Sequence, residues 1–348
     1  MMAVTLRKQN KSTQLNPKQE ENVLHDTIII AENVTVVNAL APESVPEYIK
    51  KWTDHKQMNE AVAAKMFAIG YKERAFRMYE CAKQLIYNHC SDCDTYSIAR
   101  TNLCRDRFCP TCNWRLALQR YVAMTKITQQ LMRDHSSANY SFITLTVKNC
   151  PPSELSDTMT KMSKAWDRIL HRVCMKDGAA GWAKSVEITY NAHTHMLHPH
   201  YHVLILWAGG DRSREVVGAW LQSCVKSGLE ASIKAQDWQA VHDHGEEGDT
   251  MAAAICETFK YAIKSKQLHD MPYGEFKLLV DEIGGKRLTS FGGIIKQIAA
   301  QMNVDMESLS DESVTVCRHC GSTDVDQIVY KWAFGKYERE HTFDGSDS

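Results

Sequence analysis

The sequence lacks the features that mark membrane and secreted proteins. It has no apolar run near the ~20 residues that a transmembrane helix needs, and residues 1–18 lack the apolar core of a secretory signal. The net charge is only −1, so the chain as a whole lacks the positive excess that would indicate a nucleic-acid binder. With 348 residues, 44% hydrophobic and 24% charged, we expect a globular cytoplasmic protein with one or two domains and no membrane partner.

The small net charge hides an uneven distribution. Residues 100–133 hold seven Lys and Arg against one acid, whereas residues 304–348 hold four against ten acids. A basic middle with an acidic tail fits local phosphate binding, although a solvated basic helix face explains the charge equally well. The candidate DNA contacts in the basic segment are Arg105, Arg107, Arg115 and Arg120.

Twelve cysteines in a cytoplasmic chain indicate metal ligands or buried thiols rather than disulfides. The pairs Cys90/Cys93 and Cys109/Cys112 are separated by fifteen residues, which is the spacing of structural zinc sites. Cys104 lies close enough to compete, so the ligand set stays open between the two pairs and a set that uses Cys104. A further lone pair near the end of the chain has His319 and His341 as candidate completions, and it consists of Cys317 and Cys320.

Hydrophobic periodicity predicts an α+β protein. Strands are expected at 140–147, 182–190, 198–206 and 229–241, and helices at 59–88, 114–133, 153–176, 212–227 and 250–267. This order favours a central antiparallel sheet with helices on one face. We divide the chain into a flexible arm (1–50), a helical, cysteine-rich, DNA-contacting region (51–135), the α+β domain (136–300) and an acidic tail with a Cys-x-x-Cys knuckle (301–348).

One strand carries an unusual run of histidines. His198, His200 and His202 alternate along it and therefore share one face, while Tyr201 and Val203 lie on the other. Neutral imidazole is a common metal ligand, so this face is a candidate cation site. A set of solvent-facing histidines on an edge strand is the alternative.

An acidic residue one strand earlier could complete this cation site. Glu187 precedes His200 by thirteen residues, and a tight antiparallel pairing brings its carboxylate towards His200 and His202. Two imidazoles and one carboxylate leave open positions for substrate oxygens on Mg²⁺ or Mn²⁺. A solvent-facing glutamate is the alternative for Glu187.

A tyrosine on the expected helix 250–267 is the candidate nucleophile. Glu257, Tyr261 and Lys264 are spaced to share one helix face. A phenol is a weak nucleophile at its free pKa of ~10, but a nearby cation favours the phenolate. Taken alone, a packed tyrosine is the commoner explanation of this pattern.

Together these motifs resemble the plasmid rolling-circle replication initiators of the His-hydrophobe-His (HUH) endonuclease superfamily, in the branch with a single tyrosine and an upstream glutamate. Four blocks match in order, over about residues 80 to 270. They are the cysteine block from Cys104 to Arg115, the strand from Phe142 to Thr146, the histidine strand from His198, and the segment from Glu257 to Lys264.

The resemblance implies a fold, a reaction and a role for each residue. Residues 136–300 would form the HUH nicking and joining domain. His200, His202 and Glu187 would hold the divalent cation, with His198 competing for one place. Tyr261 would attack origin DNA, single-stranded or extruded as a hairpin, to leave a 5′-phosphotyrosine and a 3′-hydroxyl primer. Lys264 would orient the tyrosine or the phosphate, and Glu257 would assist hydrolysis of a second cut that ends the round.

Some features depart from the family or leave its functions open. Members tend to carry one cysteine upstream of the Cys-x4-Cys-x-x-Cys cluster, whereas here both Cys90 and Cys93 precede it. A host helicase and polymerase would be further partners of an initiator. The alternatives are an HUH transposase or relaxase, and a non-catalytic zinc-dependent DNA-binding regulator.

Overall fold

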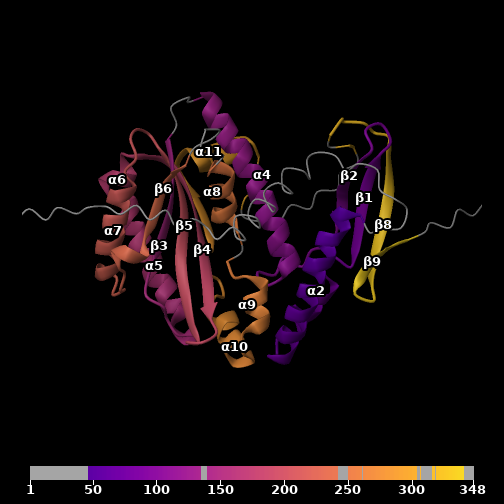
Figure 1. The fold of residues 1–348 in the computed structure, drawn as a ribbon, viewed down its shortest axis with the longest axis horizontal. Coiled ribbons are helices and arrows are strands. Elements are labelled where there is room, and N and C mark those ends of the chain that lie inside the picture. Colours follow the sequence, from indigo (N-terminus) through magenta and orange to yellow (C-terminus); the bar gives the residue numbers. More distant parts are fainter. Residues whose placement is uncertain are drawn as a thin grey trace, which may run out of the picture.

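Two antiparallel β-sheets organise the chain in the computed structural model, which describes residues 46–134, 139–241, 250–260, 262–303, 306, 316–317 and 319–340. A five-stranded sheet has the order β6-β3-β5-β4-β7, and a four-stranded sheet has the order β2-β1-β8-β9. Helices pack on both, and α4 (Pro110–Asp134) lies between them (Figure 1). The predicted α+β class with a central antiparallel sheet is therefore confirmed.

The large sheet is centred on a long hairpin. Its strands β4 and β5 pair antiparallel over most of their length, with β3 and β7 on their outer sides and β6 beyond β3. The predicted strands are present, although 229–241 contributes only its last five residues. The bounds are β3 Asn139–Thr146, β4 Ala179–Asn191, β5 Met196–Trp207, β6 Asp237–Val241 and β7 Thr289–Gly292.

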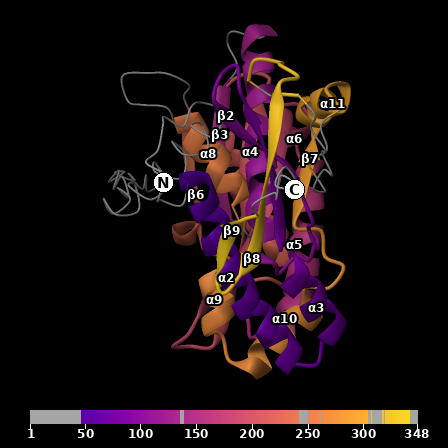
Figure 2. The same cartoon turned by 90° about the vertical axis from the view of Figure 1, so that its right-hand side faces the viewer.

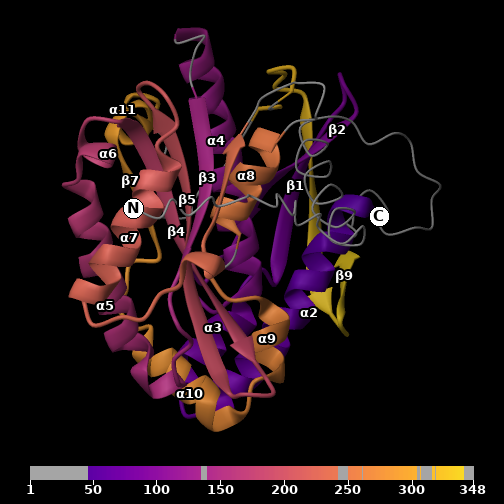
Figure 3. The same ribbon diagram turned by 60° about the vertical axis from the view of Figure 1, so that its left-hand side comes forward.

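Helices cover both faces of the large sheet, so the expectation of helices on one face was wrong. In β5, Tyr201 and Val203 pack into one core while Leu204 and Leu206 pack into a second core on the opposite side. A sheet that is apolar on both faces must be covered on both. One face carries α5 (Leu155–Leu170) and α7 (Ser213–Lys226), with α6 (Val173–Lys176) nearby (Figure 3); the other carries α4, α8 (Thr250–Phe259) and α11 (Gly293–Gln301).

The small sheet joins segments from both ends of the described chain. β1 pairs with β2 on one side and, from Gln84 to Cys90, with β8 on the other. The tail that the sequence set apart therefore supplies two strands to the cysteine-rich region, and Figure 2 shows these strands (yellow) in front. The bounds are β1 Gln84–Cys90, β2 Thr95–Thr101, β8 Val325–Ala333 and β9 Lys336–Arg339.

The expected helix 59–88 is two helices and a strand. α2 (Glu47–Ala68) starts earlier and ends before Gly70, whose φ of +96° suits glycine, and α3 (Lys72–Glu80) follows. Residues 84–90 then form β1, because buried Tyr87 packs against Tyr330 of β8, with ring centroids 6.1 Å apart. The expected arm falls mainly on residues 1–45, which lie outside the described residues.

Two short helices link the large sheet to α2. They are α9 (Ser265–Asp270) and α10 (Tyr273–Glu282). The Lys65 ammonium donates to the carbonyls of Leu268 and His269, each at 2.8 Å, at the end of α9. The remaining helical turns are 3-10 segments at Pro152–Glu154 and Ile233–Ala235. Among the described helices, none is long and apolar enough to cross a bilayer.

A buried lysine gives the large sheet a pH-dependent stability. Burial lowers the pKa of Lys184 in β4 to about 7, and its ammonium lies 3.7 Å from the centroid of the Tyr201 ring. The unfolded chain takes up this proton near pH ~10.4, so stability falls as pH is lowered from there to about 7. We expect Lys184→Met to raise the free energy of unfolding at pH 7 by up to about 5 kcal/mol.

Urea denaturation at two pH values tests this expectation. The gain from Lys184→Met should shrink to less than about 1 kcal/mol at pH 10, because the folded lysine is then neutral and the pH lies close to the unfolded-state pKa of ~10.4. Lys226→Met, at an exposed position of α7, is the matched control and should change little at either pH. Equal stabilisation by Lys184→Met at pH 7 and pH 10 would contradict a cost of charging this lysine.

Candidate active site

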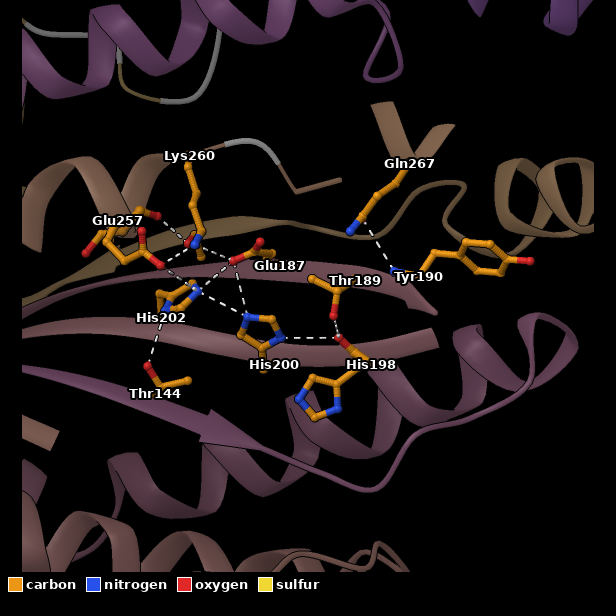
Figure 4. Close-up of polar contacts among 12 residues, drawn as sticks. Thr144, Glu187, Thr189, Tyr190, His198, His200, His202, Glu257, Lys260 and Gln267 are labelled. Carbon is orange, nitrogen blue, oxygen red and sulfur yellow. Dashed lines mark hydrogen bonds and ion pairs between the residues drawn. The ribbon is translucent and has the colours of Figure 1, made fainter. Parts of the chain in front are cut away.

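Three side chains of types that can bind a metal ion converge on the face of the large sheet that α8 covers. The Glu187 Oε2 atom lies 2.8 Å from His202 Nε2 and 3.2 Å from His200 Nε2, and the two Nε2 atoms are 3.1 Å apart (Figure 4). All three residues are buried. We call this group the His-Glu triad.

The strand register builds the His-Glu triad. Glu187 of β4 pairs directly with His200 of β5, and His202 follows two residues later on the same face. The His200 Nδ1 atom is 3.2 Å from the His198 carbonyl oxygen, and His202 Nδ1 is 3.4 Å from the Thr144 hydroxyl. These contacts turn both Nε2 atoms towards the carboxylate, as is usual for metal-binding histidines.

The electrostatics of the triad favour the protonation states that bind a cation. Burial raises the pKa of Glu187, but hydrogen bonds with His200, His202 and Lys260 outweigh it and hold the pKa below its ordinary value. Burial also lowers the pKa of His202, which keeps its imidazole neutral. An ionised carboxylate beside neutral imidazole is the form that a metal ion requires.

The spacing of the three atoms fits one face of an octahedral site. Neighbouring ligands at about 2.1 Å from a cation are about 3.0 Å apart in octahedral geometry. The three distances of 2.8, 3.1 and 3.2 Å in the triad are close to this value. Two imidazoles and a carboxylate so arranged can hold a divalent ion and leave positions open for other ligands.

A lysine that the sequence did not predict reaches the triad. The Lys260 ammonium lies 2.8 Å from Glu187 Oε2 and also contacts the carboxylate of Glu257. Burial lowers the pKa of Lys260, but the two carboxylates raise it above its ordinary value. The Glu257 Oε1 atom is 3.8 Å from His202 Nε2, so Glu257 stands beside the triad. In the sequence, Lys260 follows Glu257 at a spacing of three residues, which puts two side chains on one helix face. That spacing is the feature from which Lys260 could have been predicted.

The expected helix 250–267 ends early, which separates its predicted residues. α8 stops at Phe259 because the Ala262 carbonyl accepts a hydrogen bond from the Ile188 amide of β4, at 2.6 Å. Lys264 is exposed and precedes α9, so it does not share a helix face with Glu257. Tyr261 lies outside the described residues.

His198 is placed differently from the other two histidines. Its Nδ1 atom is 2.7 Å from the Asn149 side-chain oxygen, and its ring lies apart from Glu187 (Figure 4). The group whose ligand atoms lie within 4.8 Å of one another consists of Glu187, His200 and His202. The structure thus brings together the preferred ligand set and leaves the competing histidine outside it.

The cysteines form two groups of four. The first, which we call the base cluster, consists of Cys81, Cys104, Cys109 and Cys112. The Sγ atom of Cys112 lies 3.5 Å from that of Cys81 and 3.6 Å from that of Cys104, and the Sγ atom of Cys109 lies 3.6 Å from that of Cys81. The predicted block of Cys104, Cys109 and Cys112 thus gains Cys81 as its fourth member. The sequence missed Cys81 because the Cys90/Cys93 pair offered a more regular spacing.

The second group, the tip cluster, lies at the β1–β2 turn. It unites Cys90 and Cys93 with Cys317 and Cys320, and its four sulfurs lie within 4.8 Å of one another. A single site made from Cys90, Cys93, Cys109 and Cys112 is therefore wrong, because these pairs belong to different clusters. The C-terminal pair is completed by cysteines rather than by His319; His341 lies outside the described residues.

Arg107, Arg115 and Arg120, three candidate DNA contacts, hold other parts of the protein with their side chains. The Arg115 guanidinium lies over the ring of Trp52, at 5.3 Å. Arg107 donates to the Ile283 carbonyl at 2.6 Å, and Arg120 donates to the Met306 carbonyl at 2.8 Å. These contacts do not test DNA binding, so the assignments stay predictions.

The fourth candidate lines an open cavity beside α3. Arg105 is exposed and shares this cavity of about 640 Å³ with Arg74, Arg77 and Phe76. Phe76 is 65% exposed, so an aromatic ring stands beside several guanidinium groups. Basic and aromatic side chains together are typical of surfaces that bind single-stranded nucleic acid.

Comparisons with known proteins place the chain in a family. The profile of the Replication protein family matches residues 95–340, which include the whole large sheet, the His-Glu triad and the strands β2, β8 and β9 of the small sheet. The chain belongs to this family, which confirms the resemblance that the motifs indicated.

Relatives named Protein rep come from several bacteria. That of Streptococcus pneumoniae serotype 2 (strain D39 / NCTC 7466) is 26% identical over 279 residues, covering 76% of this chain and 85% of the relative. That of Lactiplantibacillus plantarum is 24% identical over 306 residues, covering 83% and 94%. A "Replication protein" of Staphylococcus aureus is 24% identical over 230 residues, covering 63% and 95%. No solved structure matches the chain.

Proposed function

We propose that the chain initiates plasmid rolling-circle replication by nicking one strand of its origin. The observation that carries this proposal is the His-Glu triad, whose three ligand atoms lie 2.8 to 3.2 Å apart on one sheet face. A divalent cation held there, Mg²⁺ or Mn²⁺, supplies Lewis-acid polarisation of the scissile phosphate. The family, whose members are replication proteins, supports the same assignment.

Tyr261 attacks the phosphate in this scheme. Its oxygen bonds to phosphorus, the bond from phosphorus to the 3′ oxygen breaks, and the leaving oxygen takes up a proton to become the 3′-hydroxyl primer. Support comes from the residues on either side of Tyr261. Lys260 contacts Glu187, and the Ala262 carbonyl accepts a hydrogen bond from the amide of Ile188. Both neighbours of Tyr261 therefore contact β4 at or next to Glu187.

Lys260 and Glu257 have separate roles. The Lys260 ammonium lies at the triad and can balance charge on the phosphate during attack. Lys264, which the sequence assigned to this task, is the second candidate. Glu257 serves as the general base that activates water for the second cut, so that the round ends in hydrolysis.

A variant separates the two cuts. We expect Glu257→Gln to keep the first nick but to slow the hydrolytic release by about 10²–10⁴-fold, the usual worth of a general base. The measurement is the amount of covalent protein–DNA adduct over time under single-turnover conditions, where the variant should accumulate adduct. Glu230→Gln, which removes a carboxylate paired with exposed Lys148, is the control. Normal release by Glu257→Gln would remove this role.

The whole proposal is tested by looking for the covalent intermediate. The full-length protein is incubated with Mn²⁺ and single-stranded oligonucleotides that tile the DNA around its gene, then denatured. We expect an adduct that survives denaturation, with its phosphate on a tyrosine, and a free 3′-hydroxyl on the released strand. DNA binding without any adduct or nick would instead favour the non-catalytic regulator.

A further inference from the structure

The tip cluster has the geometry of a metal site. The Sγ atoms of Cys90 and Cys320 are 3.6 Å apart, as are those of Cys93 and Cys317. Four thiolates at about 2.3 Å from a tetrahedral zinc ion lie about 3.8 Å from one another. The separations in the tip cluster are therefore close to those of a zinc site with four cysteine ligands.

The surroundings of the tip cluster are those of a metal knuckle. The pair Cys317/Cys320 lies on a tight turn, in which the Gly321 amide donates to the Cys317 carbonyl at 2.9 Å. The His319 amide donates to the Cys317 sulfur at 3.4 Å, and the Thr95 hydroxyl is 3.0 Å from the Cys93 sulfur. Such contacts to sulfur orient and stabilise metal-binding thiolates.

Exposure argues against thiols that are gathered only by packing. In the tip cluster Cys320 is exposed, Cys93 is half-buried, and Cys90 and Cys317 are buried. Of the four cysteines outside both clusters, Cys256 is half-buried and the other three, Cys150, Cys174 and Cys224, are buried. Free cysteine is among the most buried residue types and behaves as a small hydrophobic group. Four sulfurs that converge beside an exposed cysteine, Cys320, therefore indicate a ligand rather than a core.

The two halves of the tip cluster come from distant parts of the sequence. Cys93 and Cys317 are 224 positions apart, and the whole large sheet lies between them in the chain. Cys90 also ends β1, where it pairs with Val325 of β8. An ion at this point ties the turn between β1 and β2 to the segment that leads into β8.

We propose that the tip cluster binds a second structural zinc, which clasps the C-terminal strands to the β1–β2 hairpin. The base cluster lies at the opposite end of that hairpin, because Cys81 precedes β1 and Cys104 follows β2. The hairpin is thus fixed at both ends by metal. This proposal does not rest on the nicking reaction.

The two zinc ions differ in accessibility. In the base cluster, Cys81, Cys109 and Cys112 are buried, whereas in the tip cluster Cys320 is open to solvent. A chelator reaches a metal site with a solvent-exposed ligand first. The zinc ion of the tip cluster is therefore removed before the zinc ion of the base cluster. Its loss frees the segment 316–340 while the base of the hairpin stays fixed.

Metal analysis of the full-length protein, purified under reducing conditions, tests the proposal. We expect two zinc ions per chain in the natural protein and one in the double variant Cys317→Ser/Cys320→Ser. Cys174→Ala, at a buried cysteine outside both clusters, is the matched control and should keep two. One zinc in the natural protein, or two in the double variant, would overturn the proposal.

A second measurement keeps the test valid if the double variant does not fold. The natural protein is treated with EDTA, and zinc release is followed together with limited proteolysis and mass spectrometry. We expect release in two phases, the first accompanied by new cleavage within residues 316–340 and the second not. A single phase that releases both ions together, or a first phase without new cleavage there, would contradict the clasp.

Discussion

Tyr261→Phe should abolish formation of the covalent protein–DNA adduct. Phenylalanine keeps the ring but has no oxygen to bond to phosphorus, so no 5′-phosphotyrosine can form. We expect the nicking rate to fall by at least about 10⁴-fold, as when other enzymes lose their nucleophile. The measurement is the yield of denaturation-resistant adduct and of nicked strand with Mn²⁺ and an origin oligonucleotide.

The control for this variant is another tyrosine on the surface. Tyr273, at the start of α10, is 59% exposed, and Tyr273→Phe should leave the adduct yield unchanged. Mn²⁺ affinity should be unchanged in both variants, because neither residue belongs to the His-Glu triad. An adduct that persists in Tyr261→Phe would show that another side chain attacks.

The second large effect is expected for Glu187→Gln. Glutamine has the same size but no charge, so the triad loses the anion that both His202 and Lys260 contact. Loss of partners outside the ligand shell already costs about 10–100-fold in metal affinity, so loss of this ligand should cost at least about 100-fold. Isothermal titration of the full-length protein with Mn²⁺ measures this directly, and the nicking assay should fall in parallel.

A neighbouring histidine distinguishes the ligand set from its alternative. His198 is on the same strand, but its ring contacts Asn149 rather than Glu187. We therefore expect His198→Gln to retain the Mn²⁺ affinity and His200→Gln to lose it. The opposite result would replace His200 by His198 in the site, and unchanged affinity in Glu187→Gln would remove the carboxylate from it.

The His-Glu triad could be predicted because it depends on local rules. Alternation along β5 fixes the common face of His200 and His202, and a short turn between β4 and β5 fixes the register that places Glu187 opposite. Both rules need only the nearby sequence. The same alternation puts Tyr201 on the other face, as expected.

The end of α8 could not be predicted in this way. The sequence from Thr250 to Gln267 keeps a helical pattern, but the structure breaks it where the Ala262 carbonyl bonds to Ile188. That bond joins residues far apart in the chain, so no local pattern reports it. Tertiary hydrogen bonding has overridden helix propensity here.

The grouping of the cysteines could not be predicted either, for a related reason. Regular spacing identified Cys-x-x-Cys pairs that the structure gathers into groups of four, but it could not predict which pairs meet. That depends on β8 lying beside β1, and β1 itself was hidden in a stretch with a helical pattern. The presence of helices on both faces of the large sheet was missed as well. It follows from the apolar side chains on both sides of β5, which pack into two separate cores in the folded protein.

The pairing of β1 with β8 sets an order of events during synthesis on the ribosome. β1 leaves the ribosome early, yet its partner is encoded after the whole large sheet. At about 5–20 residues per second, β1 waits roughly 10–50 s for β8. During that interval the edge of β1 that β8 later covers has no strand beside it, and unpaired edges invite aggregation. The growing chain must therefore shield this edge until β8 emerges.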